Sequence, residues 1–206
     1  MENQPDILGL DASVPRGMKG LLDFKAGLFN STESSRLFQQ LKKNIQWKQE
    51  TLFLYGKRIL TPRLTAWYGD EGIAYRYSGV TFISSPWTAT LMEIKSKAEA
   101  FSGRRFNSVL LNLYRDGNDS MSWHSDDEKE LGLNPVIASV NFGQERRFDL
   151  RKKEDPKEKH AIMLTDGSIL VMKGDIQHKW QHQIAKSMKA KGTRINLTFR
   201  LISHGK

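Results

Sequence analysis

Residues 193–201 read TRINLTFRL, a segment in which polar and apolar side chains alternate along the whole length. Successive side chains of a β-strand point to opposite faces of the sheet, so the segment is predicted to form a strand with two unlike faces. The apolar face would carry Ile195, Leu197, Phe199 and Leu201, and the polar face Arg194, Asn196, Thr198 and Arg200. Solvent exposure would explain the polar face, but so would a position inside a β-structure that binds a polar ligand.

An internal polar face would require an anionic partner for its two arginines, because burying an unpaired guanidinium is costly. Arginine binds carboxylates through paired hydrogen bonds, so a small dicarboxylate would meet this requirement. Residues 111–114 read LNLY and show the same alternation, which places Asn112 and Tyr114 on one face. Both could bind the same ligand, although a core tyrosine with a satisfied hydroxyl is an equally good explanation of Tyr114.

The remainder of the C-terminal half contains a series of short strand signals. The predicted strands are 106–115, 121–126, 136–142, 146–151, 159–164, 168–173, 178–184 and 193–202. Strands without intervening helices favour a β-sandwich or jelly roll. Residues 151–159 read RKKEDPKEK and are predicted to form a solvated hairpin loop. The fold class is therefore expected to be mostly β with flanking helices.

Two amphipathic helices are predicted in the N-terminal half. One covers 32–45 behind cap residues at 30–32, and the other covers 86–101, with Ser85 as N-cap and Pro86 at the first helical position. Further strand signals lie at 52–55, 63–68 and 75–78. We expect an N-terminal arm over 1–30, helices and hairpins over 31–105, and a β core over 106–206, within one structural unit.

Composition narrows the class of protein. The 206 residues include 32 Lys and Arg against 23 Asp and Glu, a formal net charge of +9, which favours an anionic partner such as nucleic acid. The chain has no cysteine, so disulfides, thiolate metal sites and cysteine nucleophiles are excluded. No apolar run suits a transmembrane helix, and no secretion signal is recognisable. We expect a monomeric cytoplasmic protein, of bacterial origin by default.

His124 and Asp126 form a His-x-Asp pair, and on a strand residues two apart point to the same face. Both could therefore bind one metal ion. A third ligand could come from His178 or His182. Two histidines and one carboxylate suit non-haem Fe(II) oxygenases, but histidines held by ordinary hydrogen bonds would explain the residues as well.

These motifs together resemble the AlkB-like Fe(II)/2-oxoglutarate dioxygenases, and most closely the subgroup that repairs alkylated bases. The resemblance extends from about residue 62 to residue 200 and rests on the order and spacing of the motifs. They are Asn112-x-Tyr114, His124-x-Asp126, His182 and Arg194-x-Asn196-x-Thr198-x-Arg200. It implies a double-stranded β-helix, a jelly-roll core, with Fe(II) held by His124, Asp126 and His182. It further implies that 2-oxoglutarate is bound by Asn112, Tyr114, Arg194, Asn196 and Arg200.

The resemblance also implies an activity. The protein would use O2 and 2-oxoglutarate to demethylate N1-methyladenine and N3-methylcytosine in DNA, releasing succinate, CO2 and formaldehyde. Tyr75, Tyr77, Ser78 and Glu128 match positions that contact the flipped base. Tyr55 matches a wedge that fills the gap in the duplex, and Lys57, Arg58, Arg63 and Arg76 could bind DNA.

Other interpretations of the same residues remain open. The same chemistry could act on RNA, because the pocket residues do not separate RNA from DNA. It could also act on a protein or a small molecule, although the net charge and the aromatic residues at 75 and 77 argue against such a substrate. A nucleic-acid binder that has lost catalysis, or a cupin that does not use 2-oxoglutarate, would also have this fold. The complete metal triad and the paired arginines fit an inactive binder poorly, and the paired arginines fit a cupin poorly.

Overall fold

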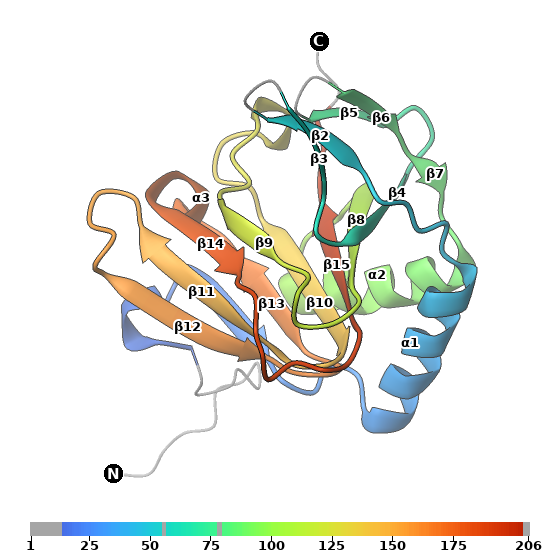
Figure 1. Ribbon diagram of the computed structural model, residues 1–206, viewed down its shortest axis with the longest axis horizontal. Coiled ribbons are helices and arrows are strands. Elements are labelled where there is room, and N and C mark those ends of the chain that lie inside the picture. Colours follow the sequence, from blue (N-terminus) through green and yellow to red (C-terminus); the bar gives the residue numbers. More distant parts are fainter. Residues whose placement is uncertain (1–13, 55–56, 78–79, 204–206) are drawn as a thin grey trace.

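The computed structural model describes residues 14–54, 57–77 and 80–203, with side chains described outside 52–57 and 74–83. Its core consists of a seven-stranded and a four-stranded β-sheet that pack against each other (Figure 1). Across the larger sheet the strands are β1 (Leu22–Lys25), β13 (Ile169–Met172), β10 (Ile137–Gly143), β15 (Arg194–Arg200), β8 (Ser108–Tyr114), β4 (Leu64–Gly69) and β7 (Ser85–Pro86). Across the smaller sheet they are β12 (Lys159–Leu164), β11 (Arg146–Lys152), β14 (Trp180–Ile184) and β9 (Met121–His124).

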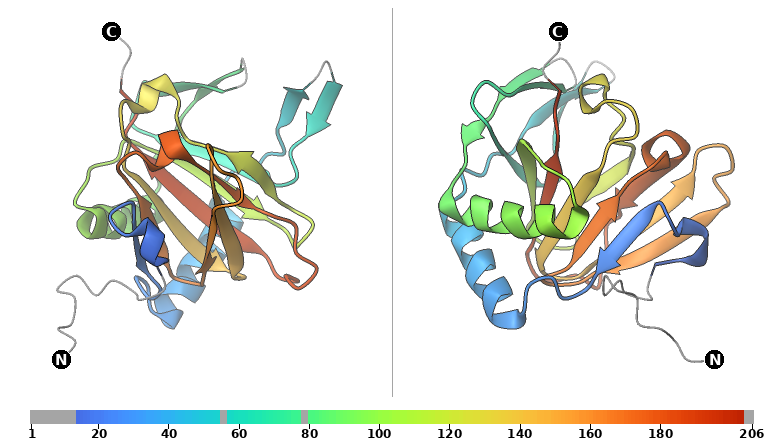
Figure 2. Two further views of the ribbon diagram at one scale, coloured as in Figure 1. Left: turned by 90° about the vertical axis from the view of Figure 1, so that its left-hand side faces the viewer. Right: turned by 180° about the vertical axis from the view of Figure 1, so that it is seen from behind.

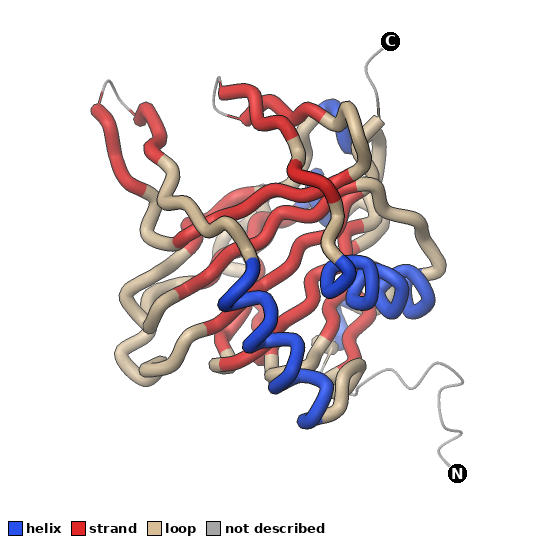
Figure 3. The backbone as a smooth tube through the Cα atoms, turned by 90° about the vertical axis from the view of Figure 1, so that its right-hand side faces the viewer, coloured by secondary structure: helices blue, strands red, loops and turns tan. Residues whose placement is uncertain are grey.

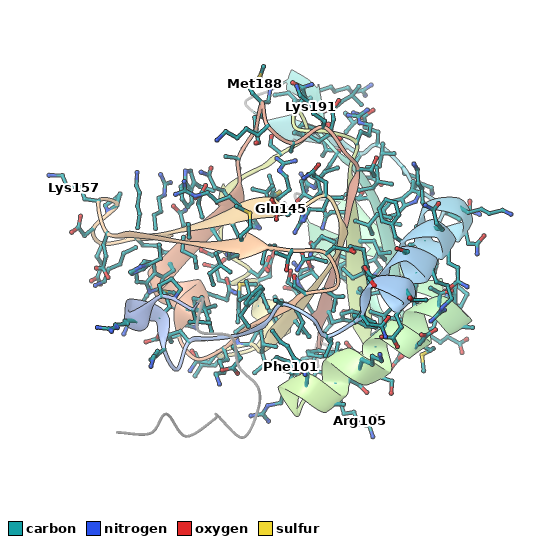
Figure 4. The ribbon with its side chains drawn as sticks, turned by 90° about the horizontal axis from the view of Figure 1, so that it is seen from below. Phe101, Arg105, Glu145, Lys157, Met188 and Lys191 are labelled. Carbon is teal, nitrogen blue, oxygen red and sulfur yellow. The ribbon has the colours of Figure 1, made fainter. Side chains whose placement is uncertain are left out.

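Strands that are distant in sequence lie side by side in both sheets. β15 is the central strand of the larger sheet and pairs antiparallel with β10 and β8, while β14 pairs antiparallel with β11 and β9. This is the predicted jelly-roll arrangement. The charged segment predicted as a loop joins β11 to β12, and Lys157 lies at its outer end (Figure 4).

Helices α1 (Ser31–Asn44) and α2 (Ala89–Ser102) cover the outer face of the larger sheet (Figure 2). Their buried side chains, such as Leu37 and Ile94, share one apolar cluster with the apolar face of β15. The first helix starts as predicted, because Asn30 accepts a hydrogen bond from the Glu33 amide and the Glu33 side chain caps the Asn30 amide in return.

The start of the second helix corrects the prediction. Ser85 and Pro86 are not its cap and first turn but form β7, which pairs in parallel with residues 68–69 of β4. The helix begins three residues later, where the Thr88 hydroxyl accepts a hydrogen bond from the Leu91 amide. Ser85 has a side chain that could cap a helix, but residues 85–86 pair with β4 instead, so the helix starts further along the chain.

β15 resolves the question raised by its alternating sequence. Ile195, Leu197 and Phe199 are fully buried against the helices, and the four polar side chains face the smaller sheet, each with 8% exposure or less. The polar face is therefore internal. Leu201 departs from the prediction, since it lies beyond the end of β15 and is exposed.

Three other expectations change. The 3-10 turn η1 (Arg16–Met18) and edge strand β1 belong to the core, with Met18 and Phe24 buried, so this part of the expected arm is closely packed. The predicted strand 178–184 begins as a one-turn helix, α3 (Ile176–Lys179), followed by β14. A second 3-10 turn, η2 (Lys129–Leu131), lies between β9 and β10, so the β half is not free of helical turns.

Two hairpins stand apart from the sheets. β2 (Thr51–Leu54) pairs with β3 (Lys57–Leu60), and β5 (Ala74–Tyr77) pairs with β6 (Val80–Ile83). Both project from the same end of the body (Figure 3). None of the helices in the described ranges has the length and apolar character that crossing a lipid bilayer requires.

Candidate active site

His124, Asp126 and His182 form a cluster between the two sheets. His124 ends β9, Asp126 follows two residues later, and His182 lies in β14 directly opposite His124 in the strand register. His124 Nε2 is 4.0 Å from Asp126 Oδ1, and His182 Nε2 is 3.9 Å from Asp126 Oδ2. One ligand atom from each of the three residues lies within 4.8 Å of the others. Two imidazoles and one carboxylate so arranged are the donor set of a mononuclear non-haem Fe(II) site, so these residues fit that ion.

The three residues of the cluster are held by neighbouring groups. His124 Nδ1 is 2.8 Å from the Ser122 carbonyl, which can only accept, so Nδ1 carries the proton and Nε2 is free to bind a metal. The Asp126 amide donates to Gln177 Oε1 at 3.0 Å, and Arg200 Nη2 donates to Asp126 Oδ1 at 2.9 Å. The Asp126 carboxylate thus has one oxygen bound to Arg200 and the other next to His182.

Electrostatics keep two of these groups in the form that binds metals. Burial alone would raise the pKa of Asp126, but the charges of Arg200, His182 and His124 lower it to about 2. The pKa of His182 is lowered to about 3, chiefly by burial and then by His124. At neutral pH the carboxyl is therefore ionised and the imidazole neutral, as metal coordination requires.

A cavity of about 250 Å³ extends from this cluster between the sheets. Its inner wall is the polar face of β15, joined by Asn112 and Tyr114 from β8. Arg200 lies at the metal-cluster end of β15 and Arg194 at the opposite end of the strand. The four polar residues of β15 and both β8 residues therefore share one compartment, which is the internal one of the two positions that the alternation allowed.

Arg194 is the group in this cavity that most clearly requires a ligand. Its guanidinium is 2% exposed and donates from Nη2 to Asn141 Oδ1 at 2.6 Å. Its Nε and Nη1 have no hydrogen-bond partner within the described ranges. Burial lowers the pKa of Arg194 to about 10. Buried, charged and with two donors unused, Arg194 fits the distal carboxylate of a small dicarboxylate such as 2-oxoglutarate.

Arg63 corrects one predicted role. Its side chain is buried, lines the cavity and donates from Nε to Asn112 Oδ1 at 2.7 Å, so it does not lie on an open surface where it would bind a phosphate. The sequence showed that Arg63 is basic, but it gave no indication that the side chain is buried. The contact arises because residues 65 and 112 are paired between β4 and β8, which brings Arg63 beside Asn112.

The structure brings together some of the other predicted residues and leaves several undescribed. Glu128 lines the cavity, whereas His178 is exposed on α3 and takes no part in the cluster. Arg58 lies exposed on β3. Tyr55 and Ser78 fall outside the described residues, and so do the side chains of Lys57, Tyr75, Arg76 and Tyr77.

Two residues that support the site were not predicted. Gln177 accepts a hydrogen bond from the Asp126 amide, and Asn141 accepts one from Arg194, but neither lies in a recognisable motif.

Comparisons with known proteins relate the chain to oxygenases that use Fe(II) and 2-oxoglutarate. The family model of the 2OG-Fe(II) oxygenase superfamily matches residues 22–200. The alpha-ketoglutarate-dependent dioxygenase alkB homolog 3 of Bos taurus is 41% identical over 185 residues, covering 85% of this chain and 64% of the relative. The DNA oxidative demethylase ALKBH2 of Homo sapiens is 37% identical, covering 85% of this chain and 71% of the relative.

The fold has a solved counterpart. The structure of OsALKBH1 superimposes with a TM-score of 0.63, covering 87% of this chain and 97% of that one, at 14% identity. At this identity the likeness concerns the fold alone. The chain spans 64% of the length of the alkB homolog 3 relatives it matches, so part of those proteins has no counterpart in it.

Proposed function

The chain belongs to the AlkB-like part of the 2OG-Fe(II) oxygenase superfamily, and from this premise we propose that it is an oxidative demethylase of N-alkylated bases in DNA. Its substrates would be N1-methyladenine and N3-methylcytosine. The observation that carries the proposal is that one cavity is lined both by the His124, Asp126 and His182 cluster and by the buried Arg194.

In this proposal His124, Asp126 and His182 hold Fe(II). Arg194 binds the distal carboxylate of 2-oxoglutarate, and Asn112, Tyr114, Asn196 and Arg200 complete its pocket. Together with O2, the bound iron and 2-oxoglutarate supply the oxidising power that removes an N-methyl group, with succinate, CO2 and formaldehyde as products.

The protein's own residues prepare this chemistry. Arg200 holds Asp126 Oδ1 and keeps the carboxylate ionised, which leaves Oδ2 directed to the side of His182. The Ser122 carbonyl fixes the His124 tautomer, and Gln177 fixes the backbone between the first two ligands. All of these supporting contacts are made within the chain itself, so they orient the three residues toward one ion.

The nucleic-acid part of the proposal has different support. Relatives that match 85% of the chain are named DNA oxidative demethylases, and the net charge of +9 favours a polyanion. We assign Tyr75, Tyr77, Ser78 and Glu128 to the base, which must leave the duplex to reach the cavity. Tyr55, Lys57, Arg58 and Arg76 are assigned to DNA contacts, and the buried Arg63 is withdrawn from that set.

The test uses short oligonucleotides that carry one N1-methyladenine, as single-stranded DNA, duplex DNA and RNA. The protein is incubated with Fe(II), 2-oxoglutarate and ascorbate, and loss of the methyl group is followed by mass spectrometry alongside succinate formation. We expect methyl loss from DNA that requires 2-oxoglutarate and that disappears in His124→Ala and His182→Ala. The matched control is His178→Ala, an exposed histidine of the same segment, which should retain activity.

The outcomes separate the alternatives. Methyl loss from RNA alone would replace DNA as the substrate. Succinate formation without methyl loss would retain the dioxygenase and reject the methylated base. No succinate from protein shown to bind iron would contradict the enzymatic proposal altogether.

A further inference from the structure

Arg146 is a buried cation that none of the roles above uses. It is the first residue of β11 and is 3% exposed. Its guanidinium donates to three backbone carbonyls: Nη1 to Asp116 at 3.1 Å, and Nη2 to Asp119 at 3.0 Å and Ala185 at 2.6 Å. Within the described ranges no carboxylate lies within ion-pair distance of it, because Asp119 pairs with Arg115 instead. All three of these hydrogen bonds of Arg146 therefore go to peptide carbonyls rather than to a carboxylate.

These carbonyls belong to two loops that Arg146 joins. Asp116 and Asp119 lie in the loop after β8, and Ala185 begins the loop between β14 and β15, which contains the outlying Met188 and Lys191 (Figure 4). The loops also touch directly: the Ser187 amide donates to the Gly117 carbonyl at 2.8 Å, and a Cβ at Gly117 would lie 1.8 Å from the Ser187 carbonyl oxygen. The two loops follow Tyr114 and precede Arg194, which are the residues at the anion end of the cavity.

Tyr114 connects Arg146 to that end of the cavity. The ring centroid of Tyr114 is 5.6 Å from Cζ of Arg146 and 4.9 Å from Cζ of Arg194, both within the range of cation–π contacts. Tyr114 is itself buried and is the register partner of Arg194 between β8 and β15. One aromatic ring thus contacts two buried guanidiniums, of which Arg194 lines the cavity and Arg146 lies behind it.

We infer that Arg146 is a positioning residue for co-substrate binding, which fixes the Tyr114 ring and adds a second positive charge behind Arg194 at the site for the distal carboxylate. The inference rests on the proposed function, because it takes 2-oxoglutarate as the dicarboxylate. In a poorly solvated interior a charge acts across a side chain with little screening. A dianion with a carboxylate at this end would compensate both guanidiniums, whereas a monoanionic keto acid would compensate neither.

The test compares two ligands that differ only at this end. 2-Oxoglutarate carries the distal carboxylate, and 2-oxopentanoate has a methyl group in its place. Binding of each to the Mn(II)-loaded full chain is measured by calorimetry, so that no turnover is needed. Arg146→Gln keeps two N–H donors on a shorter, uncharged side chain, and Arg146→Lys retains the charge. The matched control is Arg147→Gln, whose side chain is 67% exposed on the neighbouring position of β11.

We expect Arg146→Gln to weaken 2-oxoglutarate about tenfold, the effect of a lost charge interaction in a buried site, with little change for 2-oxopentanoate. Arg146→Lys should recover most of the preference for 2-oxoglutarate, and Arg147→Gln should leave both affinities unchanged. Thermal unfolding of each variant reports whether it folds.

If Arg146→Gln lowered the affinity for both keto acids equally, the inference would be overturned, because Arg146 would then only hold the two loops together. Unchanged affinities would overturn it as well. If Arg146→Gln does not fold, Arg146→Lys decides, because loss of the preference for 2-oxoglutarate despite the retained charge would contradict an electrostatic role. Failure of the wild-type protein to bind 2-oxoglutarate would instead reject the proposed function, and this inference with it.

Discussion

Asp126 is fixed by side chains from two distant segments, and these contacts explain how a short loop can hold the proposed metal ligand in place. Arg200 binds its carboxylate, and Gln177 accepts a hydrogen bond from its amide while being fully buried. His-x-Asp was visible in the sequence, and the structure brings both residues to His182, although their role as ligands remains a proposal. The role of Gln177 could not be predicted from the sequence, because its side chain contacts the backbone of a residue 51 positions away and no motif spacing indicates such a contact.

Gln177→Leu should therefore lower metal affinity. The change leaves the Asp126 amide without its acceptor, and loss of a group that supports a metal ligand typically costs about 10–100-fold in affinity. Competition titration with Mn(II) measures the effect, with the exposed His178→Ala as the control. Wild-type affinity in a folded Gln177→Leu protein would show that the loop positions Asp126 without this contact.

The metal-free protein should lose stability as the pH falls from about 6.5 to 4. The pKa of His182 is about 3 in the folded protein against 6.5 for an unperturbed histidine, so in this window the unfolded chain binds the proton and the folded one does not. Asp126 behaves differently: its pKa falls from 3.8 to about 2, so its contribution is complete above pH 4 and is lost only below it.

The pH window of 6.5 to 4 therefore belongs to the histidine. Urea unfolding at pH 7 and pH 4 should differ by on the order of 2–3 kcal/mol for the metal-free protein. His182→Gln cannot take up a proton and should reduce this difference. A difference of the same size in the folded variant would assign the acid sensitivity to other groups.

Among the secondary-structure elements, the boundaries of α2 and β14 show where local rules stop being sufficient. Ser85-Pro86 and Thr88 both satisfy the rules for a helix start, but only Ser85-Pro86 can pair with β4, and that pairing leaves Thr88 as the cap. Likewise the strand predicted from residue 178 begins at Trp180, because α3 uses the preceding residues. Periodicity located these elements well, whereas their ends depended on contacts with other elements.

Thr88→Ala should cost about 1 kcal/mol of unfolding free energy, the usual value of a lost N-cap. Ser85→Ala is the matched control, and it should cost less than about 0.5 kcal/mol, because Ser85 lies in the edge strand β7 and does not cap the helix. Chemical denaturation of both variants measures the difference. If Ser85→Ala proves the more costly, the helix start would have to be moved back to the position that the sequence suggested.

At the scale of the whole molecule, β15 accounts for both the fold and the cavity. Its apolar face packs on the helices and its polar face lines the cavity, so a single strand joins the core to the candidate site. The alternation alone allowed an exposed or an internal polar face, and the jelly roll was predictable from the series of short strands together with the resemblance to a known family. β1 was not, because a four-residue edge strand has too few residues to show a period.

Because the candidate metal ligands and Arg194 line the same cavity, we can predict how ligands stabilise the protein. A ligand that binds only the folded state, present at 100 times its dissociation constant, adds about 2.7 kcal/mol to the free energy of unfolding. For a chain of this size that raises the melting temperature by about 5–10 °C.

Mn(II) alone should give such a shift, by binding to His124, Asp126 and His182. 2-Oxoglutarate should add a further shift only when the metal is present, because in the proposed complex its keto acid would bind the metal and its distal carboxylate would bind Arg194. Arg194→Met should remove the second shift and retain the first. Thermal unfolding with each ligand tests this, and an equal effect of 2-oxoglutarate without metal, or on Arg194→Met, would mean that it binds elsewhere.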